Sequence, residues 1–577
     1  MTRTDSLVVG TLVALLAVIA SIVSVPALLP AAASNASPGA TIAPVARAYR
    51  EGVLGRPVSV SPLSARSQAD RDLVALVYAG LVRNGPSGSL VPDLAERWSV
   101  DSTGAVWTFH LREDALWHDG EPVTSEDVAF TIRVLQDPKY QGPGAGSWNE
   151  VTVTTDGILT VVFTLKTPLG GFLQAATQPI APAHILAGIP VDQLADRSFS
   201  RQPIGAGPFA VASLSDEAAD LIPAATVLGP QAPADGPSPI ATDSLAVSAA
   251  GTRPARPVPY LTGMRFLFFD DAEKLASAYR AGDLDAASGL PPVMTRDLAG
   301  AKDSRALRYP GSTLTAVLLN LRPGHPEFAN PAVRTALLAA IDRPEVVTNP
   351  FAMAAGTATG IIPPSSFLFD RTADPPVPYD PAAAQMGLAK AGWTNGPDGW
   401  RLPNAKSPLK IELLSPELAS NPAAYEAAAI VAGDWNAIGL SVTHVALPAG
   451  EFVTGRLATG KFTAAVADVT IGLDPDLYPL LASSQTLTGG SNVIGLQDPA
   501  LDTLLRAARG PGTRPERMAA YSTLQKQLAK GRYLLPLAFA DESIVVRDTL
   551  QGAAINQVAD PADRFWDVLT WRLAADR

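Results

Sequence analysis

Pairs of residues that begin helices recur in this sequence and constrain its fold. A side chain that can cap a helix stands directly before a proline at Asn330-Pro331, Asp380-Pro381 and Asp498-Pro499. The capping oxygen accepts a hydrogen bond from an unpaired N–H of the first turn, and proline suits the first helical position because that position needs no N–H. Apolar residues follow each pair at helical spacing, so the sequence predicts a helix after each of them.

Strand patterns alternate with these helices. Apolar and polar residues alternate from Trp107 to Arg112, which is the period of a half-buried strand. Thr124 and Asp127 have the spacing of a capping box ahead of a further helix. Asp156-Gly157 separates two β-rich runs, which predicts a hairpin. The sequence therefore predicts the mixed α/β class.

Composition excludes several kinds of site. The chain of 577 residues contains no cysteine, so it has no disulfide, no thiolate metal site and no cysteine nucleophile. Its five histidines show no metal-ligand spacing, and neither a phosphate-binding glycine loop nor a nucleophile elbow is present. The net charge of −11 disfavours nucleic acid as a partner. We expect a protein of two or three lobes that is not an enzyme and holds no metal or cofactor.

The N-terminus predicts export. Arg3 precedes an uncharged run from Leu7 to Leu29, and small residues follow at Ala31–Ala33. This order is typical of an export signal, and the run of 23 residues is also long enough to cross a bilayer. We expect residues 1–33 to be a cleaved signal peptide or a retained membrane anchor, followed by a linker over residues 34–45. In both cases the rest of the chain lies outside the cytoplasm, in a periplasm or at the outer face of the cell membrane.

A second low-complexity stretch runs from Leu214 to Pro259. It contains eight prolines and no aromatic residue. A segment of this composition buries little apolar surface, so we expect an exposed loop.

One long stretch carries a family resemblance. Residues 90–135 read LVPDLAERWSVDSTGAVWTFHLREDALWHDGEPVTSEDVAFTIRVL. This closely resembles the signature of the ABC-transporter solute-binding proteins that take up oligopeptides, dipeptides and nickel. Further matches follow in the family's order, at Pro203–Phe209, Ala281–Asp285, Val333–Arg343, Tyr379–Trp393 and Asp498–Asp502. The resemblance covers residues 47 to 547, almost the whole chain after the predicted signal.

The resemblance implies a two-lobed periplasmic-binding-protein-like fold of type II with an extra inserted domain. The expected segments are residues 46–62, 201–270 and 516–577 for lobe I, residues 63–200 for the inserted domain, and residues 271–515 for lobe II. The ligand would lie between the lobes, which close over it by a hinge motion.

The resemblance also implies a function. The chain would be the extracytoplasmic solute-binding component of an ABC importer, binding peptides or similar small solutes and delivering them to permease subunits in the membrane. We expect a monomer. The alternative is a membrane-anchored degenerate receptor that senses solute or scaffolds an envelope complex without transport, and a retained anchor would favour it.

Candidate cleft residues follow from the same resemblance. An aromatic face, an amide or a carboxylate could each meet a solute, while packing, capping or turn formation is the ordinary alternative for every one. The candidates are Tyr78, Trp117, Asn320, Asp474 and Asn492.

The sequence departs from the family pattern at two places. The turn at Gly205–Phe209 normally leads into a strand pair, but here the segment 214–259 takes that place, so we expect a remodelled surface or a lost hairpin. The family also carries an acid before a proline-containing acidic turn, where it binds the amino terminus of the peptide. Aligning Pro475 with that turn puts the anchoring position on Gly472, which has no side chain. We therefore expect little preference for a free peptide amino terminus.

Overall fold

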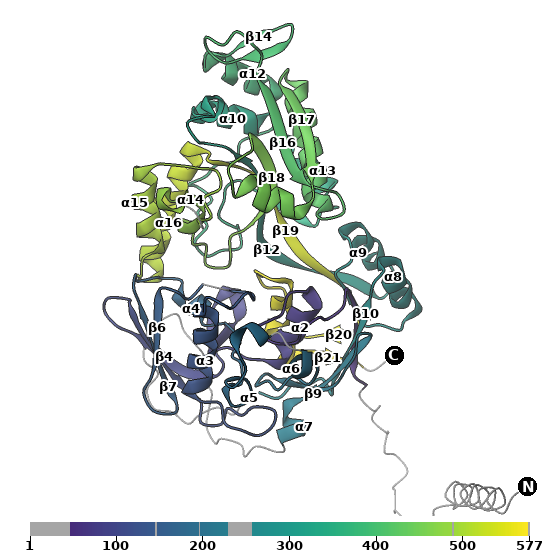
Figure 1. Ribbon diagram of the computed structural model, residues 1–577. Coiled ribbons are helices and arrows are strands. Elements are labelled where there is room, and N and C mark those ends of the chain that lie inside the picture. Colours follow the sequence, from purple (N-terminus) through teal and green to yellow (C-terminus); the bar gives the residue numbers. More distant parts are fainter. Residues whose placement is uncertain (1–46, 145–146, 195–196, 229–256, 487–489, 575–577) are drawn as a thin grey trace, which may run out of the picture. The chain divides into compact units, whose positions relative to one another are not determined.

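The computed structural model describes most of the chain after its first 46 residues (Figure 1). The described ranges are residues 47–144, 147–194, 197–228, 257–486 and 490–574. Residues 46–577 form one unit, separate from the first 45 residues. The predicted signal or anchor and the predicted linker lie outside the described residues. Within the described ranges no helix is both long enough and apolar enough to cross a membrane.

One continuous path of paired strands organises both lobes. Its order is β17 (Ser441–Leu447), β16 (Lys410–Pro416), β18 (Ala464–Thr470), β12 (Ser304–Leu319), β19 (Leu534–Arg547), β11 (Ala286–Ser288), β1 (Tyr49–Leu54), β10 (Met264–Phe269), β9 (Ala218–Pro223) and β8 (Phe209–Leu214). A short strand, β13 (Ala355–Thr357), pairs with β19 off this path. Strands β16, β17 and β18 run parallel, as do β1, β10 and β11. Each parallel group belongs to one lobe, which is the mixed α/β class that the sequence predicts.

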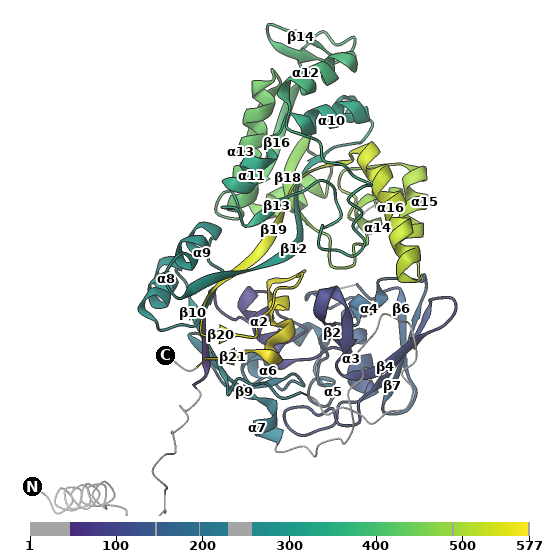
Figure 2. The same cartoon turned by 180° about the vertical axis from the view of Figure 1, so that it is seen from behind.

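Strands β12 and β19 are shared by the two lobes (Figures 1 and 2). They pair from Ser304–Pro310 with Asp541–Arg547 on the lobe I side, and from Leu314–Leu318 with Leu534–Phe539 on the lobe II side. The register shifts between Pro310 and Leu314. Within this break, an added Cβ on Gly311 would come within 2.2 Å of the Ala540 carbonyl oxygen. We call this break the joint. A two-strand ribbon with an interrupted ladder is a place where the chain can bend.

The lobe II sheet separates two cores, because its side chains alternate between faces. In β18, Ala464 and Val466 join one core, and Ala465 and Ala467 join the other. The first core is covered by α10 (Pro331–Ala339), α11 (Arg343–Thr348), α12 (Pro381–Lys390) and α13 (Pro422–Ala437). The second is covered by α14 (Tyr478–Leu481), α15 (Pro499–Arg509) and α16 (Arg514–Gly531). A small hairpin, β14 (Thr394–Gly396) with β15 (Gly399–Arg401), and a π-helix at Glu451–Leu457 complete this lobe.

The three predicted helix starts are confirmed. Asn330, Asp380 and Asp498 each accept a hydrogen bond from an N–H of the first turn of α10, α12 and α15. Each following proline occupies the start of its helix.

The inserted domain is built on an antiparallel sheet. Its order is β4 (Ala95–Val100), β5 (Val106–Leu111), β7 (Thr160–Leu165) and β6 (Val151–Thr155), with α3 (Ser125–Gln136) beside it. The predicted alternation in β5 is confirmed, since Trp107, Phe109 and Leu111 are buried. The capping box of Thr124 with Asp127 and the β6–β7 hairpin are also confirmed. Shorter elements of this region are β2 (Val82–Asn84), β3 (Leu90–Pro92), α4 (Phe172–Ala175), α5 (Ala183–Leu186) and α6 (Arg197–Arg201).

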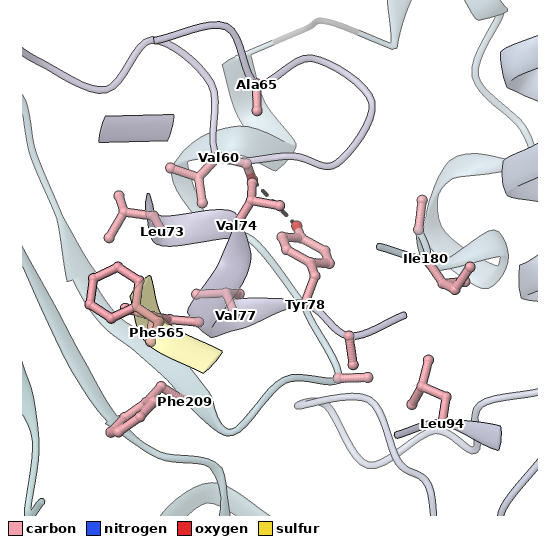
Figure 3. Packing of buried hydrophobic residues seen from close by; sticks show 14 of the residues in the cluster. Val60, Ala65, Leu73, Val74, Val77, Tyr78, Leu94, Ile180, Phe209 and Phe565 are labelled. Carbon is pink, nitrogen blue, oxygen red and sulfur yellow. Dashed lines mark hydrogen bonds between the residues drawn. The ribbon is translucent and has the colours of Figure 1, made fainter. Parts of the chain in front are cut away.

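Lobe I shares one core with the inserted domain. Figure 3 shows Leu73, Val74 and Val77 of α2 (Gln68–Val77) packed near Phe565 of the 3₁₀ helix η6 (Pro561–Thr570). Helices α8 (Ala272–Ala281) and α9 (Pro292–Ala299) form a separate small core against β11 and β19. Strands β20 (Leu550–Gln551) and β21 (Arg572–Leu573) pair near the C-terminus.

A buried ion network joins the two ends of lobe I. The Arg564 guanidinium of η6 donates to Glu51 of β1 at 2.7 Å and to both carboxylate oxygens of Asp72 in α2 at 2.6 and 2.7 Å. All three side chains are at most 2% exposed. Tyr49 donates its hydroxyl to the second oxygen of Glu51. Removing one partner of this network would leave a buried charge unpaired, which is strongly destabilising. The network therefore fixes η6 to β1 and α2.

One expectation about the segment 214–259 is wrong. Residues 218–223 form β9, which pairs with both β8 and β10, and α7 (Ala224–Leu228) follows. Ala219 and Leu221 are buried, so alternation of small and apolar residues makes a strand where proline content suggested a loop. The strand pair after Gly205–Phe209 is therefore kept rather than lost. Residues 229–256 lie outside the described part of the chain. Strand pairing and core packing group α8, α9 and β11 with lobe I and α16 with lobe II, whereas the limits given above place residues 271–299 in lobe II and residues 516–531 in lobe I. We assign the lobes by this grouping, and the exact limits of the lobes and the inserted domain stay predictions.

Candidate functional site

The carboxyl ends of the parallel strands in both lobes approach the joint. In lobe II, Thr470 at the end of β18 pairs with Thr313, beside the register break. In lobe I, β11 runs antiparallel to β19 from Val546 toward the joint. Open α/β sheets bind ligands in the crevice outside the carboxyl ends of their strands. Because both carboxyl edges converge on the joint, we identify this region as the candidate binding site.

Strand β18 has an edge that is partly free. Its pairing with β16 covers Ala464 and Ala465, while its pairing with β12 runs through to Thr470. The N–H of Ile471 donates to Ser312 of β12 at 3.1 Å. Backbone groups alternate sides along a strand, so the N–H groups of Asp468 and Thr470 point away from β12. In the described part of the chain, the last residues of β18 thus present backbone donors and acceptors on one side, which an extended ligand can pair with.

A left-handed glycine ends this edge. Gly472 has φ of +82°, a conformation that residues with a Cβ rarely adopt. The chain leaves the sheet at this point and enters the acidic turn that contains Pro475. Gly472 therefore supplies the turn and offers no side chain to a ligand.

Two acids of the turn are bound within lobe II. Asp474 accepts two hydrogen bonds from Arg517 at 2.6 and 2.7 Å, and the two side chains are 15% and 9% exposed. Burial lowers the pKa of Arg517, but the hydrogen bonds and charge of Asp474 outweigh it and raise that pKa above its usual value. Asp476 lies 2.9 Å from Arg509. Burial raises the pKa of Asp476 although Arg509 opposes the shift. Neither carboxylate is available to a ligand without breaking an ion pair.

Asp468 differs from these two acids. It is exposed, and its oxygens accept from the Thr315 hydroxyl at 2.6 Å and from the Asn421 amide at 2.7 Å. Both donors are uncharged. Asp468 therefore holds its negative charge beside the free edge of β18 without neutralisation by these partners.

The match to known proteins decides the family. Residues 89–491 match the family described as bacterial extracellular solute-binding proteins, family 5 Middle. The chain belongs to this family. The resemblance seen in residues 90–135 is thereby confirmed.

Individual members of family 5 are similar over most of their length. Protein XP55 of Streptomyces lividans is 29% identical over 511 residues, which is 87% of this chain and 85% of that protein. The oligopeptide-binding protein AppA of Bacillus subtilis is 23% identical over 534 residues, 91% of each chain. Its structure with a nonapeptide gives a TM-score of 0.68 at 21% identity and covers 92% of this chain and 100% of that one. NikZ of Campylobacter jejuni with Ni(L-His) gives 0.67 at 22% identity, covering 91% and 99%. These likenesses confirm the predicted two-lobed fold.

Within this family 5 fold, two predicted cleft residues lie in the core of lobe I and the inserted domain. Tyr78 is 3% exposed and donates its hydroxyl to the Val60 carbonyl at 3.3 Å (Figure 3), and burial raises its pKa well above the usual value. It also lines a cavity of about 500 Å³ that no residue of lobe II lines. Trp117 is fully buried, and its indole N–H lies 3.4 Å from Asp127.

The other three predicted residues lie in lobe II and are held by internal bonds. Asn320 donates to the carbonyls of Gly460 and Phe462 at 3.0 and 2.7 Å. The Asn492 amide donates to three carbonyls and accepts from the Leu496 N–H. Asp474 forms the Arg517 pair described above. The structure thus does not gather the five residues into one site, and a ligand contact by any of them stays a prediction.

The sequence reasoning missed the β18 edge and Asp468. It treated residues 468–476 as a source of side chains, whereas the structure offers a backbone edge there. The available signal was Pro416 at the end of β16, because proline has no N–H with which to continue the ladder toward β18. Among the described residues, no group of three or more His, Asp and Glu side chains could hold a metal ion.

Proposed function

We propose that this family 5 protein is the extracytoplasmic receptor of an ABC importer and that its solute is a short peptide or a peptide-like molecule. The solute lies at the joint, between the carboxyl edges of the two lobes, and the lobes close over it. The loaded, monomeric protein delivers it to permease subunits in the membrane. Relatives named for oligopeptides support this solute class.

One observation carries the proposal. The free edge of β18 at Asp468 and Thr470 offers backbone N–H groups at the convergence of both carboxyl edges. An extended peptide can add to such an edge as a further strand, and its backbone then pairs regardless of its side chains. A receptor for varied peptides needs this kind of recognition, because affinity comes from the part that all peptides share.

The proposal assigns binding and no bond making. The pair most similar to a catalytic dyad is Ser415 with His444, whose Oγ and Nε2 lie 2.8 Å apart. Ser415 is fully buried and also donates to the Pro416 carbonyl. Burial lowers the pKa of His444. A nucleophile must reach its substrate, and this serine lies inside lobe II, so the pair supports a structural role.

The test uses Thr470, whose N–H points to the free edge while its neighbours bond β12. Thr470→Pro removes that N–H, whereas Thr470→Val keeps it and changes only the hydroxyl. Calorimetry with tetra-alanine should show about tenfold weaker binding for the proline variant, equivalent to about 1.4 kcal/mol. The valine variant should stay within about twofold of the parent.

Equal affinities of the two variants would contradict strand addition at β18. If tetra-alanine binds none of the proteins, the peptide class is wrong. Mass spectrometry of the small molecule that co-purifies with the exported protein then identifies the solute class directly.

A further inference from the structure

A second contact, away from the joint, connects the inserted domain to lobe II. The Gly170 N–H of the inserted domain donates to the Arg509 carbonyl of α15 at 2.9 Å. The last carbonyls of a helix have no partner within the helix, so Gly170 completes the C-terminus of α15 from another domain. An added Cβ on Gly170 would lie 2.5 Å from the Gly510 carbonyl oxygen and 2.8 Å from Arg517 Nε. There is no room here for even one methyl group.

Two further glycines of the inserted domain fit the same surface. A Cβ on Gly171 would lie 2.9 Å from Cγ of Asp474, and a Cβ on Gly104 would lie 2.6 Å from Cβ of Pro511. We define the glycine contact as Gly104, Gly170 and Gly171 against Asp474, Arg509–Pro511 and Arg517. At each glycine, the backbone of the inserted domain lies against backbone or a fixed side chain of lobe II. The two surfaces can therefore fit together at only one separation.

The lobe II side of the glycine contact is held rigid by its own bonds. Arg517 is fixed by the bidentate pair with Asp474 and lies 5.8 Å from the Tyr521 ring centre. Arg509 is fixed by Asp476 and stacks 4.5 Å over the Tyr478 ring. A rigid surface loses little conformational entropy when the inserted domain docks on it, which favours a contact that forms and breaks as a unit.

We propose that the glycine contact is a latch: it forms when the lobes close, and it sets how strongly the closed form is favoured. The acids on its lobe II side, Asp474 and Asp476, stand in the turn that directly follows the free edge of β18. Solute on that edge and the latch therefore act on the same short segment. A contact made only in the closed form raises the closed population, and the apparent affinity for solute rises in proportion.

The test exploits the absence of cysteine in the natural chain. Pyrene attached to Ser102→Cys and Gly512→Cys, which neighbour Gly104 and Pro511, gives excimer fluorescence when the contact forms. The parent should show the excimer band, and more strongly with tetra-alanine than without it, because solute favours the closed form. Gly170→Val should lower the excimer-to-monomer ratio at least about fivefold, since its side chain separates the surfaces, and Gly170→Ala should lower it less.

Gly188→Val is the matched control. Gly188 lies in the same domain, has no atom within 4 Å of an added Cβ and adopts an ordinary backbone conformation. It should keep the parent's excimer ratio, and circular dichroism should show that every variant is folded. An excimer ratio that Gly170→Val leaves unchanged overturns the latch, as does a labelled parent that gives no excimer with or without tetra-alanine.

The binding arm rests on the proposed function. Gly170→Val should bind tetra-alanine about fivefold more weakly than Gly188→Val, because less of the protein is closed. Equal affinities with a lost excimer would overturn the role of the latch in affinity. If tetra-alanine binds neither protein, the peptide assignment fails, and the excimer comparison still decides whether the latch exists.

Discussion

Two regions of the molecule use their residues differently: the family motif at residues 90–135 and the segment 464–476 at the end of β18. In the stretch 90–135, Trp117, Asp127 and Phe109 are buried, and the Trp117 indole N–H lies 3.4 Å from Asp127. In the segment 464–476, the part proposed to face the ligand is a backbone edge with one exposed acid, Asp468. The stretch that identifies the family therefore serves packing, whereas the proposed solute contact depends on the path of the backbone. Two family members can share the first and differ in the second, so family membership does not fix the solute.

The largest effect on stability should come from the family motif at residues 90–135. Trp117→Ala removes a fully buried indole and should lower the free energy of unfolding by about 3–5 kcal/mol, measured by urea titration. Trp98→Ala, at a half-buried site in β4, should cost less. Affinity for tetra-alanine should not change in the protein that remains folded. Lost affinity at unchanged stability would instead make Trp117 a solute contact, and the contrast between the two regions would fail.

A smaller effect on stability should come from the turn after β18. Asp474→Asn removes the charge that Arg517 is paired with at a site where both side chains are largely buried, and it should cost about 3 kcal/mol of unfolding free energy. Asp468→Asn is the matched control, because its carboxylate is exposed and its donors are neutral, and it should cost little. If the Asp474→Asn protein kept the parent's stability but no longer bound tetra-alanine, Asp474 would be a ligand anchor rather than a structural acid.

The smallest effect concerns the amino terminus of the ligand. Tetra-alanine and its N-acetylated form should bind with affinities within about twofold, because Asp474 and Asp476 are occupied by arginines and Gly472 has no side chain. Asp468 is exposed, so water weakens any ion pair it forms with the amine. Calorimetry compares the two peptides. A loss of tenfold or more on acetylation, about 1.4 kcal/mol, would show that an acid binds the amine. Asp468→Asn should then abolish the difference in affinity between the two peptides, because Asp468 lies beside the free edge of β18 and its hydrogen-bond donors are uncharged.

Local sequence signals predicted the local structure well. Asn330, Asp380 and Asp498 cap their helices as expected because a cap depends on residues within one turn. The strand β9 was missed because proline content was weighed above the alternation of Ala219 and Leu221. The β18 edge could not be predicted from its own residues, since whether a strand edge is free depends on where β16 ends. The glycine contact joins residues more than three hundred positions apart, and no pattern within either segment reveals it.

The Arg564 network has a consequence for the order in which the chain matures. Its partners Glu51 and Asp72 lie 513 and 492 positions earlier in the sequence. Lobe I therefore cannot be completed until the last few residues have been synthesised, whereas most strands of lobe II come from one contiguous stretch. Contacts of such long range form slowly because closing the loop between them costs entropy. Lobe I thus stays incompletely folded until the residues around Arg564 are available, whereas lobe II can fold earlier.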